Sequence, residues 1–297
     1  MKRTGLNCQA GVSVIELMVS MIIGLVIMGA LVASYAGTTR TNRVAIAQGE
    51  MNEDAQYALK VIMRQVQQAG YNPRQSTTNL RNTLTTALTV IGCDAGFVST
   101  TADPSALQCK PATALEGGSI AITYEADIFN TVPTSGGIPT HCLGRSAKRQ
   151  PPLPDPVTHY VAENRLFVDD GKLRCTGLSA TDQTDNLAEN VESVKFDYGV
   201  SKQGAGPRLA GYLTATEIGK PNDPSVTGVH PDLALLTLEQ RWALVKTVRV
   251  CLVMRSKKPV FGEAVKSRNC DGELAEPDRH LRRAYFATAA IRNRLAP

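Results

Sequence analysis

The chain has 297 residues, a formal net charge of +5 and 43% hydrophobic residues. A chain of this length allows one large or two small domains and can bury a core without a metal or a cofactor. The small net charge does not indicate a nucleic-acid-binding protein, because such proteins gather Lys and Arg on one face.

An apolar segment lies close to the N-terminus. Residues 12–36 read VSVIELMVSMIIGLVIMGALVASYA, with Glu16 as their only charge, and follow a leader that carries Lys2 and Arg3. About 20 apolar residues can span a bilayer, whereas a carboxylate near the centre of a spanning helix costs roughly 2.5–3.5 kcal/mol. The segment therefore predicts a transmembrane helix in which Glu16 needs a partner.

The position of Gly11 distinguishes this segment from an ordinary secretory signal, in which the small residues of the cleavage site follow the apolar core. Here Gly11 precedes the core, and the string GVSVIELMVS resembles the type IV prepilin signal. That resemblance implies cleavage after Gly11 by a prepilin peptidase, N-methylation of Val12, and pairing of Glu16 with the terminal amine of a neighbouring subunit. Two departures are Val12, where the family usually has Phe, and Cys8 in the leader. The alternative is a plain N-terminal anchor with an incidental acid.

The cysteines indicate an oxidising compartment. Of the seven, Cys8 would leave with the leader, and the other six are spread along the chain without a CxxC motif. An even set behind a membrane-insertion segment is typical of periplasmic disulfides. Six cysteines allow fifteen pairings. The sequential set is favoured because each bond closes a short loop: Cys93–Cys109, Cys142–Cys175 and Cys251–Cys270.

The helix is predicted to continue beyond the membrane, from about Val14 to Ala69. Apolar or small residues recur at steps of three and four, which marks one face of a helix; they are Val44, Ala47, Met51, Ala55, Ala58, Ile62, Val66 and Ala69. Gly70 follows as a terminating glycine. The second half would lay this stripe on a globular domain.

The rest of the chain favours β-structure. Residues 71–118 and 131–156 are interpreted as loops, and 119–124 as a strand. A hairpin is expected at Asp170-Gly171. Further strands are expected over 190–200, over 246–256 and within 281–295, where 285–288 form the core. A Gly- and Pro-rich loop is expected from Lys202 to about Pro231, and a short helix from Leu233 to Leu244.

These later segments resemble the PilW family of minor type IV pilins. The resemblance is carried by AQYALKVIMRQVQQAGY, VTHYVAE…LRC, VESVKFDYG, VKTVRVCLVMRS and LRRAYFATAAIRN. It implies a pilin-like α+β fold: a leader (1–11), a long helix (12–70, with 12–36 in the membrane), and a mainly antiparallel β head with disulfides (71–297).

No other motif indicates chemistry. His141 beside Cys142 lacks a second ligand at a metal-site spacing, and Asp182, Asp185 and Asn186 lack the Gly and Glu of a calcium loop. The basic run Arg145, Lys148 and Arg149 is typical of a solvated loop, and the aromatic residues Tyr71, Trp242, Tyr285 and Phe286 are typical of a core. No catalytic residue, metal or cofactor is expected.

By resemblance, the function would be assembly. The chain would sit in the bacterial inner membrane with its head in the periplasm, and then join other minor pilins and the major pilin in a tip complex that primes the pilus and supports twitching motility and adhesion. Its partners would include the prepilin peptidase and the inner-membrane assembly machinery. Three alternatives remain: a type II secretion pseudopilin, a tip adhesin or DNA-uptake receptor, and an anchored periplasmic enzyme.

Overall fold

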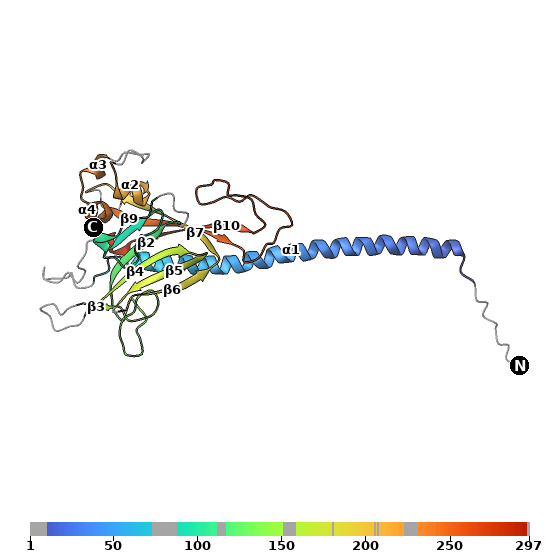
Figure 1. Ribbon diagram of the computed structural model, residues 1–297, viewed down its shortest axis with the longest axis horizontal. Coiled ribbons are helices and arrows are strands. Elements are labelled where there is room, and N and C mark those ends of the chain that lie inside the picture. The colour runs from blue at the N-terminus through green and yellow to red at the C-terminus, as the bar shows by residue number, and fades with distance from the viewer. Residues whose placement is uncertain are drawn as a thin grey trace.

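A long helix carries a β-rich head at its C-terminal half. The computed structural model describes residues 11–72, 88–111, 117–150, 159–179, 181–204, 206, 208–222 and 231–295. Helix α1 (Val14–Gln68) has 55 residues, and its first half projects from the head as a bare rod (Figure 1). The predicted α+β class, with a long helix and antiparallel sheets, is confirmed.

Helix α1 ends where the sequence predicts a terminating glycine. Gly70 has a φ of +71°, which favours glycine over residues with a Cβ. The amides of Ala69 and Tyr71 donate to the carbonyls of Val66 and Gln68 and so tighten the last turn. The chain then passes into the head.

Two antiparallel sheets form the head. The first has the order β1-β2-β4-β5-β6, with β3 paired to β4, and the second has the order β10-β9-β7-β8. The strands of the first sheet are β1 (Val90–Cys93), β2 (Ser119–Ala126), β3 (Lys148–Arg149), β4 (Tyr160–Asp169), β5 (Lys172–Leu178) and β6 (Gln183–Glu189). Those of the second are β7 (Val191–Ser201), β8 (Leu209–Leu213), β9 (Val245–Arg255) and β10 (Arg282–Ala290).

The turn between β4 and β5 shows how local sequence sets strand register. Asp170 and Gly171 both have positive φ, +48° and +68°. This is the pattern of a type I′ hairpin, whose twist matches that of the flanking strands. The turn pairs Asp169 with Lys172 and brings Leu166 opposite Cys175.

Several loop predictions were wrong. The region 71–118 contains β1, a run of four buried residues too short to show a period. The region predicted as a loop after Lys202 contains β8 and α2 (Ala215–Gly219), and β6 also escaped prediction. Most residues of β8 and β6 are exposed, and these strands form because β7 and β5 offer paired edges.

The helix predicted from Leu233 to Leu244 is split in two. Helix α3 (Pro231–Ala234) ends before Leu235, and α4 (Leu238–Ala243) begins at Leu238. Thr237 caps α4, accepting from the Gln240 amide while the Gln240 side chain accepts from the Thr237 amide. This capping box starts a new helix inside an otherwise continuous apolar pattern. Single 3₁₀ turns lie at Pro104–Ala106 and Arg292–Arg294.

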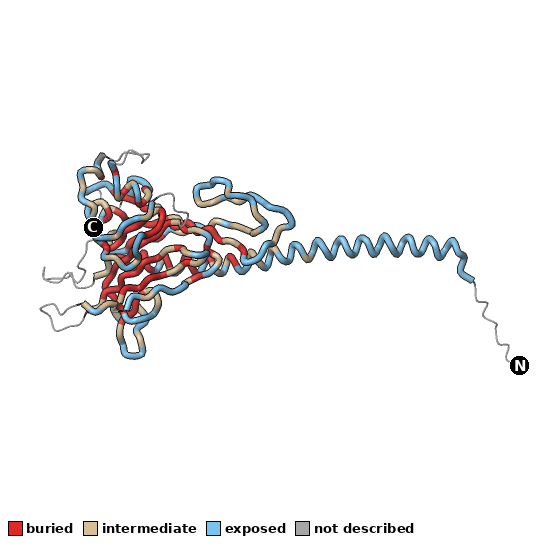
Figure 2. Tube along the Cα trace, viewed as in Figure 1, coloured by how far each residue is buried: buried red, intermediate tan, exposed pale blue. Residues whose placement is uncertain are grey.

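The core lies where the second half of α1 meets the head. Figure 2 shows buried residues throughout the sheets and along this part of the helix, and none along the projecting rod. Helix α1 packs against β10, β9, β6 and β2. The buried aromatic pair Tyr198 and Trp242 meets edge to face, with ring centroids 5.0 Å apart.

Candidate assembly helix and its docking to the head

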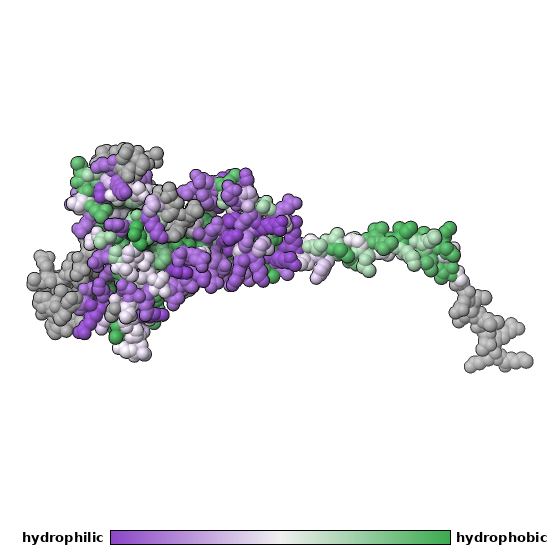
Figure 3. Space-filling model, in the orientation of Figure 1, coloured by the Kyte–Doolittle hydropathy of each residue, from purple (hydrophilic) through white to green (hydrophobic). Residues whose placement is uncertain are grey.

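The first half of α1 is an apolar surface that the head does not cover. Every large apolar side chain from Val12 to Tyr35 is at least 51% exposed. Figure 3 shows this half as a continuous hydrophobic rod next to a hydrophilic head. By length and hydropathy α1 can span a membrane. A surface of this size in a chain with a folded head requires lipid or other protein around it.

The residues of the predicted processing site lie at the tip of this rod. Gly11, Val12 and Ser13 precede the helix, and Ser13 is extended. The peptide bond after Gly11 is therefore outside the helix, and among the described residues a Cβ added at Gly11 would meet nothing within 4 Å apart from its chain neighbours. The rest of the predicted leader, 1–10, lies outside the described residues.

Glu16 lies in the first turn of α1. A carboxylate is favoured there because the helix dipole is positive at the N-terminus. The Ser20 hydroxyl donates to the Glu16 backbone carbonyl at 2.7 Å. The Glu16 side chain is exposed, so its carboxylate is open to a group from another chain.

The second half of α1 buries the stripe that its spacing predicts. Met51, Ala55, Ala58, Ile62 and Val66 are each at most 2% exposed. Two of the five are alanines, which lets the helix approach the strands of the head closely. This apolar contact is the main stabilising term at the junction, since burying a large side chain contributes about 1.5–3 kcal/mol.

Polar contacts fix the register of the helix on the head. The Tyr285 hydroxyl of β10 donates to Asn52 Oδ1 at 2.5 Å, and Asn190 Nδ2 donates to Asp54 Oδ2 at 3.1 Å. At the end of the helix Gln68 Nε2 donates to the Asn130 carbonyl at 2.6 Å. These bonds reach β10, the residue between β6 and β7, and the loop after β2, so the helix cannot slide without breaking contacts to several parts of the head.

A buried polar network lies at the centre of this junction. Gln65 Oε1 accepts hydrogen bonds from Tyr124 Oη at 3.2 Å and from Asn164 Nδ2 at 2.6 Å. Asn164 Oδ1 in turn accepts from the Cys142 amide at 3.1 Å. All three side chains are at least 92% buried. The network therefore connects the helix to β2, β4 and a disulfide.

Burial raises the pKa of Tyr124 to about 12, although its hydrogen bonds with Asn164 and Gln65 lower it. An unfolded tyrosine titrates near 10. Because the folded pKa is the higher one, the stabilisation is present below about pH 10 and is lost as the pH rises from 10 to 12.

We expect Tyr124→Phe to flatten the alkaline stability profile. Between pH 10 and 12 the wild-type full chain in detergent should lose about 3 kcal/mol of unfolding free energy through this group. The variant lacks the titrating hydroxyl, so its loss of unfolding free energy over the same pH range should be smaller by about 3 kcal/mol. Denaturant unfolding at each pH measures both losses. Tyr57→Phe, at an exposed site on α1, is the control. Equal slopes for all three proteins would contradict the assignment.

Three disulfides cross-link the head. They join Cys93 to Cys109, Cys142 to Cys175 and Cys251 to Cys270, so each bond links two cysteines that are consecutive in the sequence after Cys8. The first closes the loop that follows β1, and the last ties the loop after β9 back to that strand. Each bond limits the unfolded chain and stabilises the head by about 2–4 kcal/mol.

The other residues considered for chemistry are dispersed. His141 is buried with Nδ1 accepting from the Leu143 amide, and its pKa is lowered by burial and by Arg145. Asp182 accepts from the Ser179 amide, and Asp185 of β6 pairs with Arg145 at 3.8 Å. In the described part of the chain no group of three His, Cys, Asp or Glu side chains could hold a metal ion.

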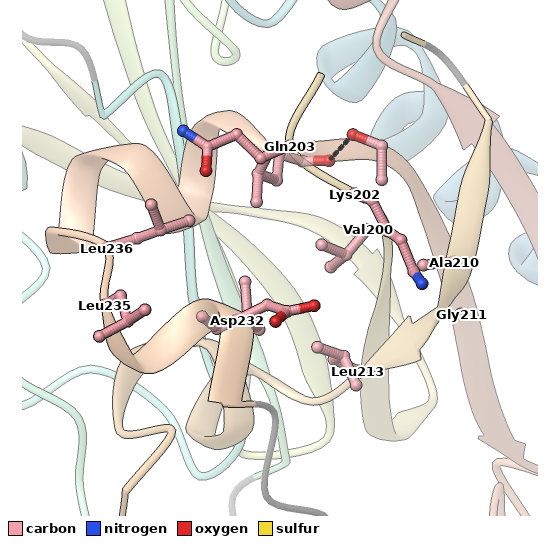
Figure 4. Close-up of a pocket in the computed structure, with 12 residues that line it drawn as sticks. Val200, Lys202, Gln203, Ala210, Gly211, Leu213, Asp232, Leu235 and Leu236 are labelled. Atoms are coloured by element: carbon pink, nitrogen blue, oxygen red, sulfur yellow. Dashed lines mark hydrogen bonds between the residues drawn. The ribbon is translucent and has the colours of Figure 1, made fainter. Parts of the chain in front are cut away.

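A pocket of about 600 Å³ lies in the head near α3 and β8. Its lining is mainly aliphatic, with Val200, Leu213, Leu235 and Leu236 around it (Figure 4). The Ser201 hydroxyl donates to the Leu244 carbonyl at 3.2 Å and is thereby occupied. Lys202, Gln203 and Asp232 supply the remaining polar groups, and the pocket shows no paired acid and base.

Sequence reasoning missed the residues that join the helix to the head. Gln65 is a polar residue within the apolar stripe, directly before Val66, and that interruption was the available signal. Arg294, which holds the C-terminal turn against the head rather than against α1, gave no signal. Its guanidinium donates to the carbonyls of Trp242 and Val245, at 2.6 and 3.0 Å, and to Thr89 Oγ1 at 2.7 Å.

The C-terminal half of the head matches a known protein family. Residues 158–293 match the family model described as Type IV Pilus-assembly protein W. A type IV-like pilin from Thermus thermophilus is similar in structure, with a TM-score of 0.39 and 12% identity over 82% of this chain and 98% of that one. No curated protein matches the chain.

Proposed function

Because residues 158–293 belong to the Type IV Pilus-assembly protein W family, we propose that this chain is a minor pilin. It would act in assembly rather than catalysis. The observation that carries the proposal is the bare apolar half of α1, in which every large apolar side chain is at least 51% exposed. Such a surface, rigidly joined to a folded head, suits a subunit that moves from a membrane into a filament.

The chemistry of assembly follows from this surface. Lipid tails are as apolar as Leu, so the apolar residues from Val14 to Val32 gain little by leaving lipid, and helix association depends on close packing and polar contacts. Gly24 and Gly29 have open space around them and allow neighbouring helices to approach. Glu16 supplies the polar contact: its carboxylate loses its desolvation penalty when it meets the terminal amine of another subunit.

The junction gives the head a fixed position in a filament. The buried stripe and the Gln65 network prevent the head from rotating about α1, so any surface of the head is placed by the packing of the helices. We propose that the head, residues 71–297, lies in the periplasm before assembly and that residues 12–36 cross the inner membrane. In the filament the head would contribute to a tip complex with other minor pilins that primes the major pilin and supports twitching motility and adhesion.

Processing after Gly11 tests the proposal. In membranes containing the prepilin peptidase, we expect the chain to begin at N-methylated Val12, as measured by intact mass and N-terminal sequencing. Without the peptidase it should begin at Met1. Gly11→Asp should keep the leader in both strains, whereas Ser13→Ala, two residues away, should be processed normally. A chain cut after the apolar segment, or one uncut in the presence of the peptidase, would overturn the proposal.

A further inference from the structure

A small cavity lies between the last turns of α1 and the loop that follows β2. Arg64 and Gln65 of α1 line one side of it, and Val132 and His141 of the loop line the other. The cavity has a volume of about 220 Å³. Sites for small molecules typically have roughly 300–1,000 Å³, so this cavity suits a single side chain better than a whole ligand.

The polar groups around this cavity include donors without acceptors. Arg64 is exposed and, among the described residues, takes part in no ion pair. Gln65 Oε1 already accepts hydrogen bonds from Tyr124 and Asn164, which leaves the amide Nε2 of Gln65 to donate. The residues that line the cavity in the described part of the chain include no Asp or Glu. The cavity therefore offers positive charge and N–H groups without a carboxylate of its own.

His141 adds a donor that the fold leaves unsatisfied. The residue is 4% exposed, and its Nδ1 accepts from the Leu143 amide at 3.2 Å, so Nε2 carries the proton of the neutral ring. Burial, together with the charge of Arg145, lowers the pKa of His141 and keeps the ring neutral. Within the described residues Nε2 has no hydrogen-bond partner. A buried donor without an acceptor is destabilising, so an acceptor in the cavity would be favoured.

Three exposed apolar side chains stand beside the cavity. Phe129 is 89% exposed, Val132 71% and Ile128 54%, and Val132 also lines the cavity. The turn that carries them is held by Asp127 Oδ1, which accepts from the amides of Phe129 and Asn130 at 2.7 and 2.8 Å. An aromatic side chain on a well-ordered turn loses little entropy on binding, and aromatic residues are enriched among the hot spots of protein interfaces.

We propose that the cavity receives an acidic side chain of a partner protein, whose apolar residues pack on Ile128, Phe129 and Val132. The carboxylate would accept from Arg64 and Gln65 and would supply the acceptor that His141 lacks. Charge complementarity favours an acid. The adjoining apolar side chains favour an acid carried by a polypeptide, because a free anion would make no contact with them. The inference concerns the chemistry of a partner and does not depend on the proposed function.

Saturation-transfer NMR with the full chain in nanodiscs measures the binding of small probes, with empty nanodiscs as the blank. The probes are two blocked tripeptides, leucyl-glutamyl-leucine and leucyl-glutaminyl-leucine, which differ in the charge of the central side chain. We expect the acidic tripeptide to bind at least about fivefold more tightly, because charge-assisted hydrogen bonds are stronger than neutral ones. Equal dissociation constants, or no binding of either probe, would overturn the inference.

Two variants of α1 locate the acid. Arg64→Gln should remove the preference for the acidic tripeptide, whereas Lys60→Gln should keep it. Lys60 is the matched control, because it is an exposed cation one turn earlier on α1 and does not line the cavity. A preference that survives in Arg64→Gln, or that falls equally in both variants, would contradict the assignment to this cavity.

Further probes test the polypeptide source of the acid. Blocked glycyl-glutamyl-glycine and acetate carry the carboxylate without apolar neighbours, so both should bind at least about fivefold more weakly than leucyl-glutamyl-leucine. Phe129→Ala replaces a side chain that is 89% exposed and should reduce that advantage. Acetate that binds as tightly as the leucine tripeptide would show a site for free anions and would refute the docking of a partner.

Discussion

Replacement of Glu16 by alanine is expected to leave the chain in the membrane and to lower its incorporation into a pilus by up to about a hundredfold. An acid near the centre of a spanning helix costs roughly 2.5–3.5 kcal/mol, which is the upper limit for Glu16 in the first turn of α1, and that cost disappears where an amine meets it. Alanine carries no desolvation cost in the membrane and no attraction to an amine in the pilus. Relative to the wild type, the variant therefore favours the membrane over the pilus. An energy difference of about 3 kcal/mol corresponds to about two orders of magnitude in a partition ratio.

The measurement compares the amount of chain in sheared pili with the amount in membranes. Ser20→Ala is the matched control, because Ser20 lies one turn further along the same exposed helix and its hydroxyl donates to the Glu16 backbone carbonyl rather than to the carboxylate. Glu16→Asp keeps the charge with a shorter reach and should incorporate at an intermediate level. Wild-type incorporation of the alanine variant would remove the pairing role of Glu16.

Features set by neighbouring residues could be predicted from the sequence. The stripe from Met51 to Val66 repeats at helical spacing, and it is the buried face of α1. Asp170-Gly171 occupies the left-handed backbone positions that its hairpin requires. In both places the information lies within a few residues of the structure that it specifies, so no tertiary contact was needed to find it.

Features set by distant partners could not be predicted. Strand β8 is short and mostly exposed, and it exists because β7 presents an edge from Tyr198 to Ser201. Strand β1 is four buried residues in a region with the composition of a loop. The same limit applies to the junction: Gln65 meets Tyr124 and Asn164, which are 59 and 99 residues away.

The predicted assembly residues belong to the features that neighbouring residues set. Gly11, Val12 and Glu16 form a local motif, and the structure adds that they lie at the exposed tip of a helix whose dipole favours an acid. Their roles depend on other chains, and they stay predictions. What the fold contributes is the separation of tasks along one helix: an apolar half for insertion, a charged middle segment, and a buried end that holds the head.

Gln65→Leu is expected to destabilise the head by about 4 kcal/mol, although leucine would complete the apolar stripe of α1. The substitution leaves Tyr124 Oη and Asn164 Nδ2 buried without their shared acceptor, and each unsatisfied group costs about 1–3 kcal/mol. Their own hydrogen bond is long, at 3.3 Å, and satisfies only one donor. Improved hydrophobic patterning and lower stability would therefore occur together.

Denaturant unfolding of the full chain in detergent measures this effect. Gln56→Leu, at an exposed position of the same helix, should change the free energy of unfolding by less than about 0.5 kcal/mol. In the double variant Gln65→Leu with Tyr124→Phe, one orphaned donor is removed, so the combined loss should be smaller than the sum of the two single losses. Additive losses would show that the two side chains do not share the acceptor.

A network of this kind makes the end of α1 specific for this head. A purely apolar stripe would allow the helix to pack on the head in several rotations, whereas the Gln65 oxygen accepts both donors in only one of them.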